Sequence, residues 1–295
     1  MRIMDYNEFS AINEKLITFN NKVYPKNDQI VIMCGGGGSG KGFVISNVLG
    51  INAKILNVDD IKETLIKMKR DNPMSKQYYE EFGIYLDEVD MTNPKHVSDL
   101  HEFASQNGLA KKQNNLLFKQ QATKKVKDNI LFDVTLKSYP KLEDIAVLAG
   151  MGGYDINNIH LVWVLNSFET AKKQNQMRSR KVADKVLQKT HQGCAEQMLN
   201  ILKYGKGHDI VGGDVWIYFG STFTGDAKQM VSPNGGKYLS DFCCIKCKSA
   251  GKDYRDYEEL MNEKVRVFDT DGNETGKVTL REKINSYIPL ENEKF

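Results

Sequence analysis

Several features are scarce in this chain of 295 residues, and each scarcity excludes a class of protein. No apolar run approaches the roughly 20 residues that a transmembrane helix needs, so we expect no membrane span. The opening stretch, Met1–Glu8, lacks the apolar core of a secretion signal. The five cysteines are an odd number without framework spacing. Reduced thiols and a cytoplasmic protein are therefore expected.

The net charge is also small, at +3, and by itself it does not indicate a nucleic-acid partner. Hydrophobic residues make up 40% of the chain and charged residues 27%, as in ordinary globular proteins. A chain of this length and composition can form one large domain, or a domain with an extension. Local clusters of charge therefore carry more information than the total.

The most informative stretch is residues 30–41, which read Ile-Val-Ile-Met-Cys-Gly-Gly-Gly-Gly-Ser-Gly-Lys. An apolar strand, a glycine-rich loop and a helix with apolar spacing follow one another, and the loop fits the phosphate-binding pattern G-x-x-x-x-G-K. Glycines let successive backbone N–H groups turn toward phosphate oxygens, and a lysine adds a full positive charge. We predict that ATP phosphates bind Gly35, Gly36, Gly37, Gly38, Ser39, Gly40, Lys41 and Gly42.

One position departs from this pattern. The residue after Lys41 is ordinarily Ser or Thr, whose hydroxyl binds Mg²⁺, and here it is Gly42. Nucleotide binding is still expected, because the cradle is backbone and lysine, whereas the hydroxyl that ordinarily coordinates the metal is missing. A flexible glycine linker is the alternative interpretation, but a linker would not join a strand to a helix or end in Gly-Lys.

Five apolar runs, separated by segments with helical spacing, predict an α/β protein with a five-stranded parallel sheet and helices on both faces. The runs are 29–34, 54–58, 129–134, 158–165 and 215–219. We assign 1–27 to an N-terminal lead-in helix, 28–220 to a P-loop kinase domain and 221–295 to a C-terminal α+β extension. Residues 264–280 read as a hairpin.

Carboxylates follow two of these strands, where ligands bind in open α/β sheets. Asp59 and Asp60 come directly after the second strand, and Asp133 lies at the end of the third. A carboxylate there can take the proton of an attacking hydroxyl. An apolar run that ends in Asp is also typical of the carboxylate that reaches Mg²⁺ in NTP-binding proteins, so Asp133 and Asp59 are candidate metal ligands. Helix capping is the alternative role for Asp59 or Asp60.

Two segments are strongly basic. Residues 168–190 hold seven Lys or Arg and two acidic residues, and small P-loop kinases carry a lid in this part of the chain. Arg178 and Arg180 are the candidates to clamp the moving phosphoryl group, since the guanidinium fork matches phosphate oxygens. We also expect one long helix over residues 101–127, of which residues 109–127 hold six lysines and no acidic residue. Each segment has a simpler alternative, a solvated helix face.

Together these motifs resemble the zeta-toxin and polynucleotide-kinase branch of P-loop kinases, over roughly residues 28–220. In that branch an Asp after the second strand is the base, and it matches Asp59. A basic residue three positions on matches Lys62, and Asp133 with Thr135 resembles the end of the next strand. The resemblance implies that Asp60, Lys62, Asp133 and Thr135 bind substrate, with Asp59, Lys41, Arg178 and Arg180 catalytic.

The resemblance implies an ATP-dependent kinase that uses Mg²⁺ and phosphorylates a hydroxyl. Zeta-type relatives act on an amino-sugar nucleotide, polynucleotide kinases on a 5′-hydroxyl of nucleic acid, and phage relatives include kinases for hydroxymethylated bases in DNA. Two alternatives stay open: a nucleotide-binding module without phosphotransfer, because of Gly42, and a nucleic-acid-binding P-loop protein. The acceptor and the oligomeric state are left open.

Overall fold

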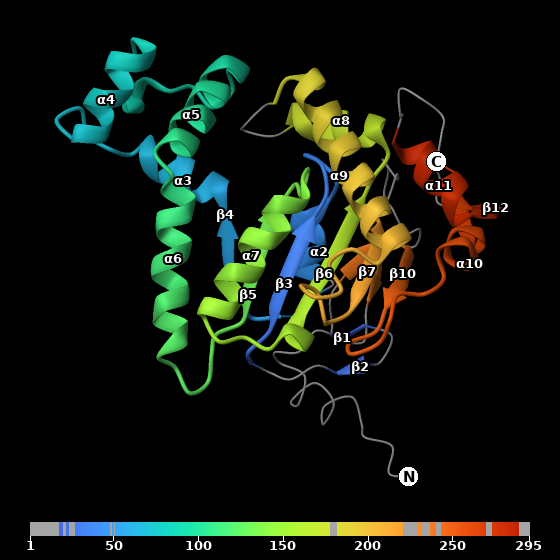
Figure 1. Ribbon diagram of the computed structural model, residues 1–295. Coiled ribbons are helices and arrows are strands. Elements are labelled where there is room, and N and C mark those ends of the chain that lie inside the picture. Colours follow the sequence, from blue (N-terminus) through green and yellow to red (C-terminus); the bar gives the residue numbers. More distant parts are fainter. Residues whose placement is uncertain are drawn as a thin grey trace.

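A six-stranded sheet forms the centre of the protein, with helices against both of its faces (Figure 1). The computed structural model describes residues 18–19, 22–23, 27–47, 49, 51–177, 182–220, 229–231, 237–239, 243–269 and 273–288. The strand order is β10-β7-β6-β3-β5-β4. Five of these strands run parallel and β10 runs antiparallel to its neighbour.

The parallel strands coincide with the five predicted apolar runs, so the predicted α/β parallel sheet is confirmed. They are β3 (Ile30–Cys34), β4 (Lys54–Asn57), β5 (Ile130–Val134), β6 (Ile159–Leu165) and β7 (Val215–Phe219). β3 lies in the middle of the parallel strands. The loop that follows it therefore has the ends of β5 and β4 on one side and those of β6 and β7 on the other.

Alternate residues of the strands enter two different apolar cores. In β3, Ile30 and Ile32 pack toward α7 (Tyr139–Met151) and α9 (Asp184–Tyr204). Val31 and Met33 pack on the opposite face, where α2 (Lys41–Asn47) supplies Val44. The strand is fully buried, as its unbroken apolar run predicted.

A group of helices fills the connection from β4 to β5. It comprises α3 (Val58–Leu65), α4 (Pro73–Phe82), the short helix η1 (Leu86–Glu88), α5 (Pro94–Gln106) and α6 (Leu109–Ala122). A separate small core, including Tyr78, Leu100 and Phe103, holds α3 to α5 together. The single helix expected over residues 101–127 is wrong, because Gly108 adopts φ +59° and divides it in two.

The structure describes only part of the N-terminal segment for which a lead-in helix was predicted. Residues 1–17 lie outside the described residues, and β1 (Thr18–Phe19) pairs with β2 (Lys22–Val23). The lead-in helix predicted within residues 1–27 therefore does not include Thr18–Phe19 or Lys22–Val23. The chain between β6 and α9 contains α8 (Phe168–Met177), and η2 (Ile156–Asn158) precedes β6. Among the described helices, none has the length and apolar character to cross a membrane.

The C-terminal residues complete the main core instead of forming a separate unit. β10 (Cys243–Lys248) pairs with β7. The predicted hairpin is present as β11 (Lys264–Phe268) and β12 (Glu274–Thr279), although its turn at 270–272 lies outside the described residues. Two small strands, β8 (Gln229–Val231) and β9 (Lys237–Leu239), precede β10.

Helices α10 (Tyr257–Asn262) and α11 (Leu280–Tyr287) place Leu260, Leu280 and Ile284 in the same apolar cluster as Ile217 and Phe219 of β7. These C-terminal side chains are almost fully buried. The apolar core thus continues across the domain boundary that was predicted at residue 220, because side chains from both sides of it pack in one cluster.

This continuity predicts the effect of Leu260→Ala. The side chain is 1% exposed, and removing it should lower the free energy of unfolding by about 2–5 kcal/mol. The chain has two tryptophans, Trp163 and Trp216, and both lie in the central sheet. Their fluorescence during denaturant unfolding therefore reports on the sheet alone. Lys252→Ala, at an exposed position of the same segment, is the control. An unchanged tryptophan transition in Leu260→Ala would show that the segment is independent.

Candidate active site

The glycine-rich loop joins β3 to α2 at the carboxyl end of the sheet, as the strand–loop–helix prediction requires. Gly38 and Gly40 adopt φ +69° and +94°, which side chains other than glycine rarely tolerate. This backbone turns the chain sharply into α2. The loop therefore has the wound conformation that lets backbone N–H groups face one point.

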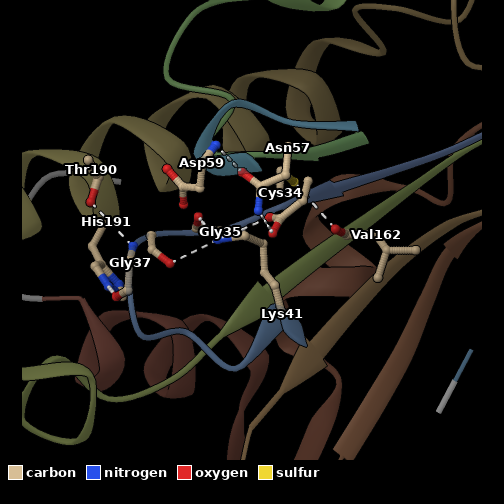
Figure 2. Close-up of polar contacts among 11 residues, drawn as sticks. Cys34, Gly35, Gly37, Lys41, Asn57, Asp59, Val162, Thr190 and His191 are labelled. Carbon is tan, nitrogen blue, oxygen red and sulfur yellow. Dashed lines mark hydrogen bonds and ion pairs between the residues drawn. The ribbon is translucent and has the colours of Figure 1, made fainter. Parts of the chain in front are cut away.

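Lys41 begins α2, and its ammonium lies over the loop that precedes it (Figure 2). The Nζ atom donates to the carbonyl oxygens of Gly35 at 2.7 Å and Gly36 at 3.1 Å. It also lies 3.7 Å from Asp133 Oδ1 at the end of β5. With 12% of its side chain exposed, Lys41 is a nearly buried cation between the loop and a carboxylate.

Asn57 connects the carboxylate of Asp133 to the backbone of Asp59. Its Oδ1 accepts a hydrogen bond from the backbone N–H of Asp59 at 2.9 Å, which caps helix α3. Its Nδ2 donates to Asp133 Oδ2 at 3.3 Å. Because Asn57 is the cap, capping does not account for Asp59 or Asp60. One amide thus holds the start of α3 against the end of β5 (Figure 2).

Asp59 is held by a second partner, Lys62, which lies one turn along α3. Lys62 Nζ is 3.3 Å from Asp59 Oδ1 and only 7% of the lysine side chain is exposed. Lys62, predicted to bind substrate, therefore contacts Asp59 in this structure. Asp60 is exposed on the same helix. Partial burial, followed by the charges of Glu63, Asp59 and Asp133, raises the pKa of Asp60.

The loop after β5 is strained close to Asp133. Leu136 adopts φ +47°, which is uncommon for a residue with a side chain, and it is 1% exposed. Apolar burial therefore stabilises a backbone conformation that is unfavourable on its own, as often occurs beside functional sites. Thr135, predicted to bind substrate, is half-buried and precedes it directly.

Three successive loop glycines are in close contact with α8 and α9, which the sequence did not predict. A Cβ at any of them would lie under 3.0 Å from a neighbouring atom. The nearest atoms are the ring Cδ2 of His191 for Gly36 at 2.1 Å, Leu187 Cδ1 for Gly37 at 2.8 Å and the Ala171 carbonyl oxygen for Gly38 at 2.6 Å. Close helix packing thus excludes a side chain at Gly36 and Gly38, whereas at Gly37 the flexible end of Leu187 could move aside.

His191 is the main residue that sequence reasoning missed. It is 2% exposed, and its Nε2 lies 2.7 Å from the Gly37 carbonyl oxygen. Burial lowers the pKa of His191, and the charge of Lys41 lowers it further, against the opposing effect of the Gly37 hydrogen bond. No motif or spacing marked this histidine, which lies 154 residues from Gly37 along the chain.

The positions of Ser39 and Gly42 bear on what the loop can hold. Ser39 Oγ is buried and has no hydrogen-bond partner among the described residues, so a polar ligand in the loop could satisfy this hydroxyl. A Cβ at Gly42 would have no atom within 4 Å in the part of the chain that the structure describes. The absence of a hydroxyl at residue 42 therefore does not result from crowding.

Asp133 and Asp59 are predicted, from the sequence, to hold a magnesium ion. Among the described residues, no group of three or more His, Cys, Asp or Glu side chains could hold a metal. Mg²⁺ keeps several waters and commonly takes one or two carboxylates together with substrate phosphates. Asp133, which accepts from Asn57, and Asp59, whose backbone N–H donates to the same Asn57, are the two carboxylates predicted for this role.

Of the basic residues predicted for a lid, Arg178 and Arg180 lie outside the described residues. The helices on either side of them are described, and both contact the glycine loop through Ala171 and His191. Asn175 binds both backbone groups of Val182, at 2.7 and 3.1 Å. The lysine-rich segment forms most of α6 and its continuation, where Lys111, Lys112, Lys119, Lys124 and Lys125 are exposed.

Comparison with protein families and with curated proteins gave no match. Comparison with solved structures found AvrRxo1-ORF1:-ORF2 with ATP, at 12% identity and a TM-score of 0.48, over 79% of this chain and 61% of that one. The native AvrRxo1 complex gave 14% identity and a TM-score of 0.47, over 80% and 66%. The chain thus spans under two thirds of the AvrRxo1 chains.

The PezAT chromosomal toxin–antitoxin system of Streptococcus pneumoniae is similar at 15% identity and a TM-score of 0.41, over 72% of this chain and 76% of that one. Likenesses at this level say nothing of the reaction or the acceptor. The strand order and the strand–loop–helix unit are observed directly in this chain. The predicted α/β fold, in which a glycine-rich loop follows the middle one of five parallel strands and leads into a helix, is therefore the fold of this protein.

Proposed function

We propose that this protein is an ATP-dependent kinase that transfers the γ-phosphate of ATP to a hydroxyl of a sugar nucleotide or a nucleic acid. One observation carries the proposal. Lys41 of the loop lies 3.7 Å from Asp133, and Asn57 joins Asp133 to the start of α3, where Asp59 lies. One chain of contacts thus runs from the phosphate-binding loop and its cation through the Asp133 carboxylate to the backbone of Asp59.

The loop and Lys41 form the phosphate side of this arrangement. Backbone N–H groups and the start of α2 favour negative charge at the loop. Lys41 now donates to two neutral carbonyl oxygens, and an ion pair with phosphate oxygens is stronger than such bonds. We therefore expect its ammonium to turn to the β- and γ-phosphates when ATP binds.

Asp59 forms the acceptor side and is proposed as the general base. Asn57 and Lys62 fix its backbone and carboxylate, so that a substrate hydroxyl can donate its proton to a positioned oxygen. Asp60, Thr135 and Asp133 are proposed to orient the acceptor. Mg²⁺, when bound at Asp133 and Asp59, would neutralise charge on the phosphates.

Arg178 and Arg180 are proposed to stabilise charge on the moving phosphoryl group. What supports this is the packing of α8 and α9 directly on the loop, since these helices flank the two arginines.

Gly42 supports a different function, a module that binds ATP without transferring phosphate. Turnover of ATP in the presence of an acceptor separates the two.

The first prediction concerns the proposed base. Asp59→Asn should lower the rate of phosphate transfer by about 10²–10⁴-fold, because the amide cannot take the proton. ATP binding should stay within about twofold, since Asp59 is not part of the loop. Transfer from γ-labelled ATP and calorimetric titration with ATP measure the two effects. Glu63→Gln, at an exposed position of the same helix, should retain most of the rate. Full activity in Asp59→Asn would exclude the assignment.

The second prediction concerns Gly42. Because a side chain at residue 42 has open space, Gly42→Ser should fold as the wild type does and restore the usual hydroxyl ligand. The Mg²⁺ concentration for half-maximal transfer should then fall several-fold. Gly42→Ala adds the Cβ alone and is the matched control. Equal Mg²⁺ requirements in all three proteins would show that residue 42 does not face the metal.

The acceptor is identified by direct transfer. Labelled γ-phosphate from ATP is offered to DNA, RNA and sugar nucleotides in parallel, with wild-type protein and Asp59→Asn. We expect label to enter one class of acceptor and to depend on Asp59. Tight ATP binding without transfer to any acceptor would favour the module without phosphotransfer.

A further inference from the structure

We propose that His191 is a positioning residue for the phosphate-binding loop, and that through Gly37 it aims the N–H of Gly38 toward the phosphates. The inference rests on the proposed function, because it concerns how the same loop binds ATP. Its basis is that both backbone polar groups of Gly37 face α9. His191 Nε2 lies 2.7 Å from the Gly37 oxygen, and the Gly37 N–H points to Thr190 Oγ1 at 3.5 Å (Figure 2).

The histidine ring has little freedom to move. Its Cδ2, Cγ and Nε2 lie 2.1–2.4 Å from where a Cβ of Gly36 would be, so the ring rests on the loop backbone itself. Phe168 of α8 packs edge-on against it, with the ring centroids 5.9 Å apart. With 2% of the residue exposed, the position of Nε2 is set by packing.

The chemistry of the contact fixes the proton. A carbonyl oxygen only accepts, so Nε2 carries the hydrogen and donates it to Gly37. The neutral imidazole suffices for this bond, and burial together with the nearby charge of Lys41 favours the neutral form. The contact therefore does not add a second positive charge beside Lys41.

The consequence for the loop follows from the planarity of the peptide bond. The Gly37 carbonyl and the Gly38 N–H belong to one trans peptide unit, in which they point in opposite directions. A carbonyl held toward α9 therefore directs the Gly38 N–H away from α9. Gly38 is the fourth residue of the phosphate-binding pattern, and its φ angle is +69°. Because glycine has no side chain that could pack against a neighbour, the conformation of Gly38 depends on contacts of the backbone.

Thr190 contributes a weaker contact. Its hydroxyl donates to the Leu187 carbonyl oxygen within α9 at 2.6 Å and so presents a lone pair to the Gly37 N–H. The distance of 3.5 Å is long for a hydrogen bond. A phosphate oxygen can therefore replace Thr190 at this N–H, whereas the shorter His191 contact persists.

The test compares His191→Gln with His191→Met. Glutamine can place an amide N–H close to where Nε2 lies, and methionine fills similar space without a donor. We expect His191→Met to raise the Kd and the KM for ATP about tenfold, the cost of one buried acceptor left without a donor, with a smaller change in kcat. His191→Gln should stay within about threefold of the wild type in both constants.

His160→Met is the matched control. His160 is also buried, and its ring nitrogens bind Gln29 at 2.9 Å and the backbone of Asp214 at 2.9 Å, but it lies at the start of β6, away from the loop. It should lower the free energy of unfolding without changing the Kd for ATP. Equal weakening of ATP binding by both methionine variants would mean general destabilisation and would overturn the proposal.

The outcomes separate this inference from the proposed function. Calorimetry measures ATP binding without any phosphate transfer. If wild-type protein binds ATP and His191→Met binds it equally well, the positioning role is overturned while the kinase proposal stands. If binding weakens in His191→Met alone but no acceptor is phosphorylated, the positioning role stands and the kinase proposal fails. If wild-type protein does not bind ATP, both are overturned.

Discussion

The contact between α9 and the glycine-rich loop is the constraint on which the site depends. The His191 ring rests on Gly36, so no side chain fits there, and α8 imposes the same limit at Gly38. Below the loop, Cys34 at the end of β3 and Cys194 of α9 lie in the same buried apolar core. Burial and its neighbour Cys194 raise the pKa of the Cys34 thiol. The loop is therefore supported from below and from one side by apolar packing.

The parts of this arrangement that the sequence predicts are those encoded locally. Lys41 and the five parallel strands follow from a motif and from apolar runs, because a strand buried on both faces needs apolar residues throughout. β10 was not predicted as part of this sheet: at the sheet edge, Cys243–Lys248 alternates lysines with less polar residues and forms no such run. Gly108 divided a predicted helix because its left-handed conformation is not evident from spacing alone.

The long-range contacts could not be predicted in the same way. His191 is far from Gly37 in the sequence, and a histidine within a helix has no feature that distinguishes it from a core residue. Asp59 and Asp133 were placed at the ligand edge because both follow strands, yet their link through Asn57 depends on β4 and β5 being neighbours. Strand order is a property of the whole sheet. The roles of Asp59, Asp133 and the two arginines remain predictions.

The absence of space at Gly36 has a consequence for how this site can vary. Residue 36 and residue 191 occupy one volume, which the histidine ring fills at present. A relative with alanine or serine at the first of these positions would therefore need a smaller residue at the second, and it would then lose the donor to the loop. Residues 36 and 191 should therefore change together. A paired substitution would distinguish relatives in which α9 donates a hydrogen bond to the loop from relatives in which other contacts hold the loop.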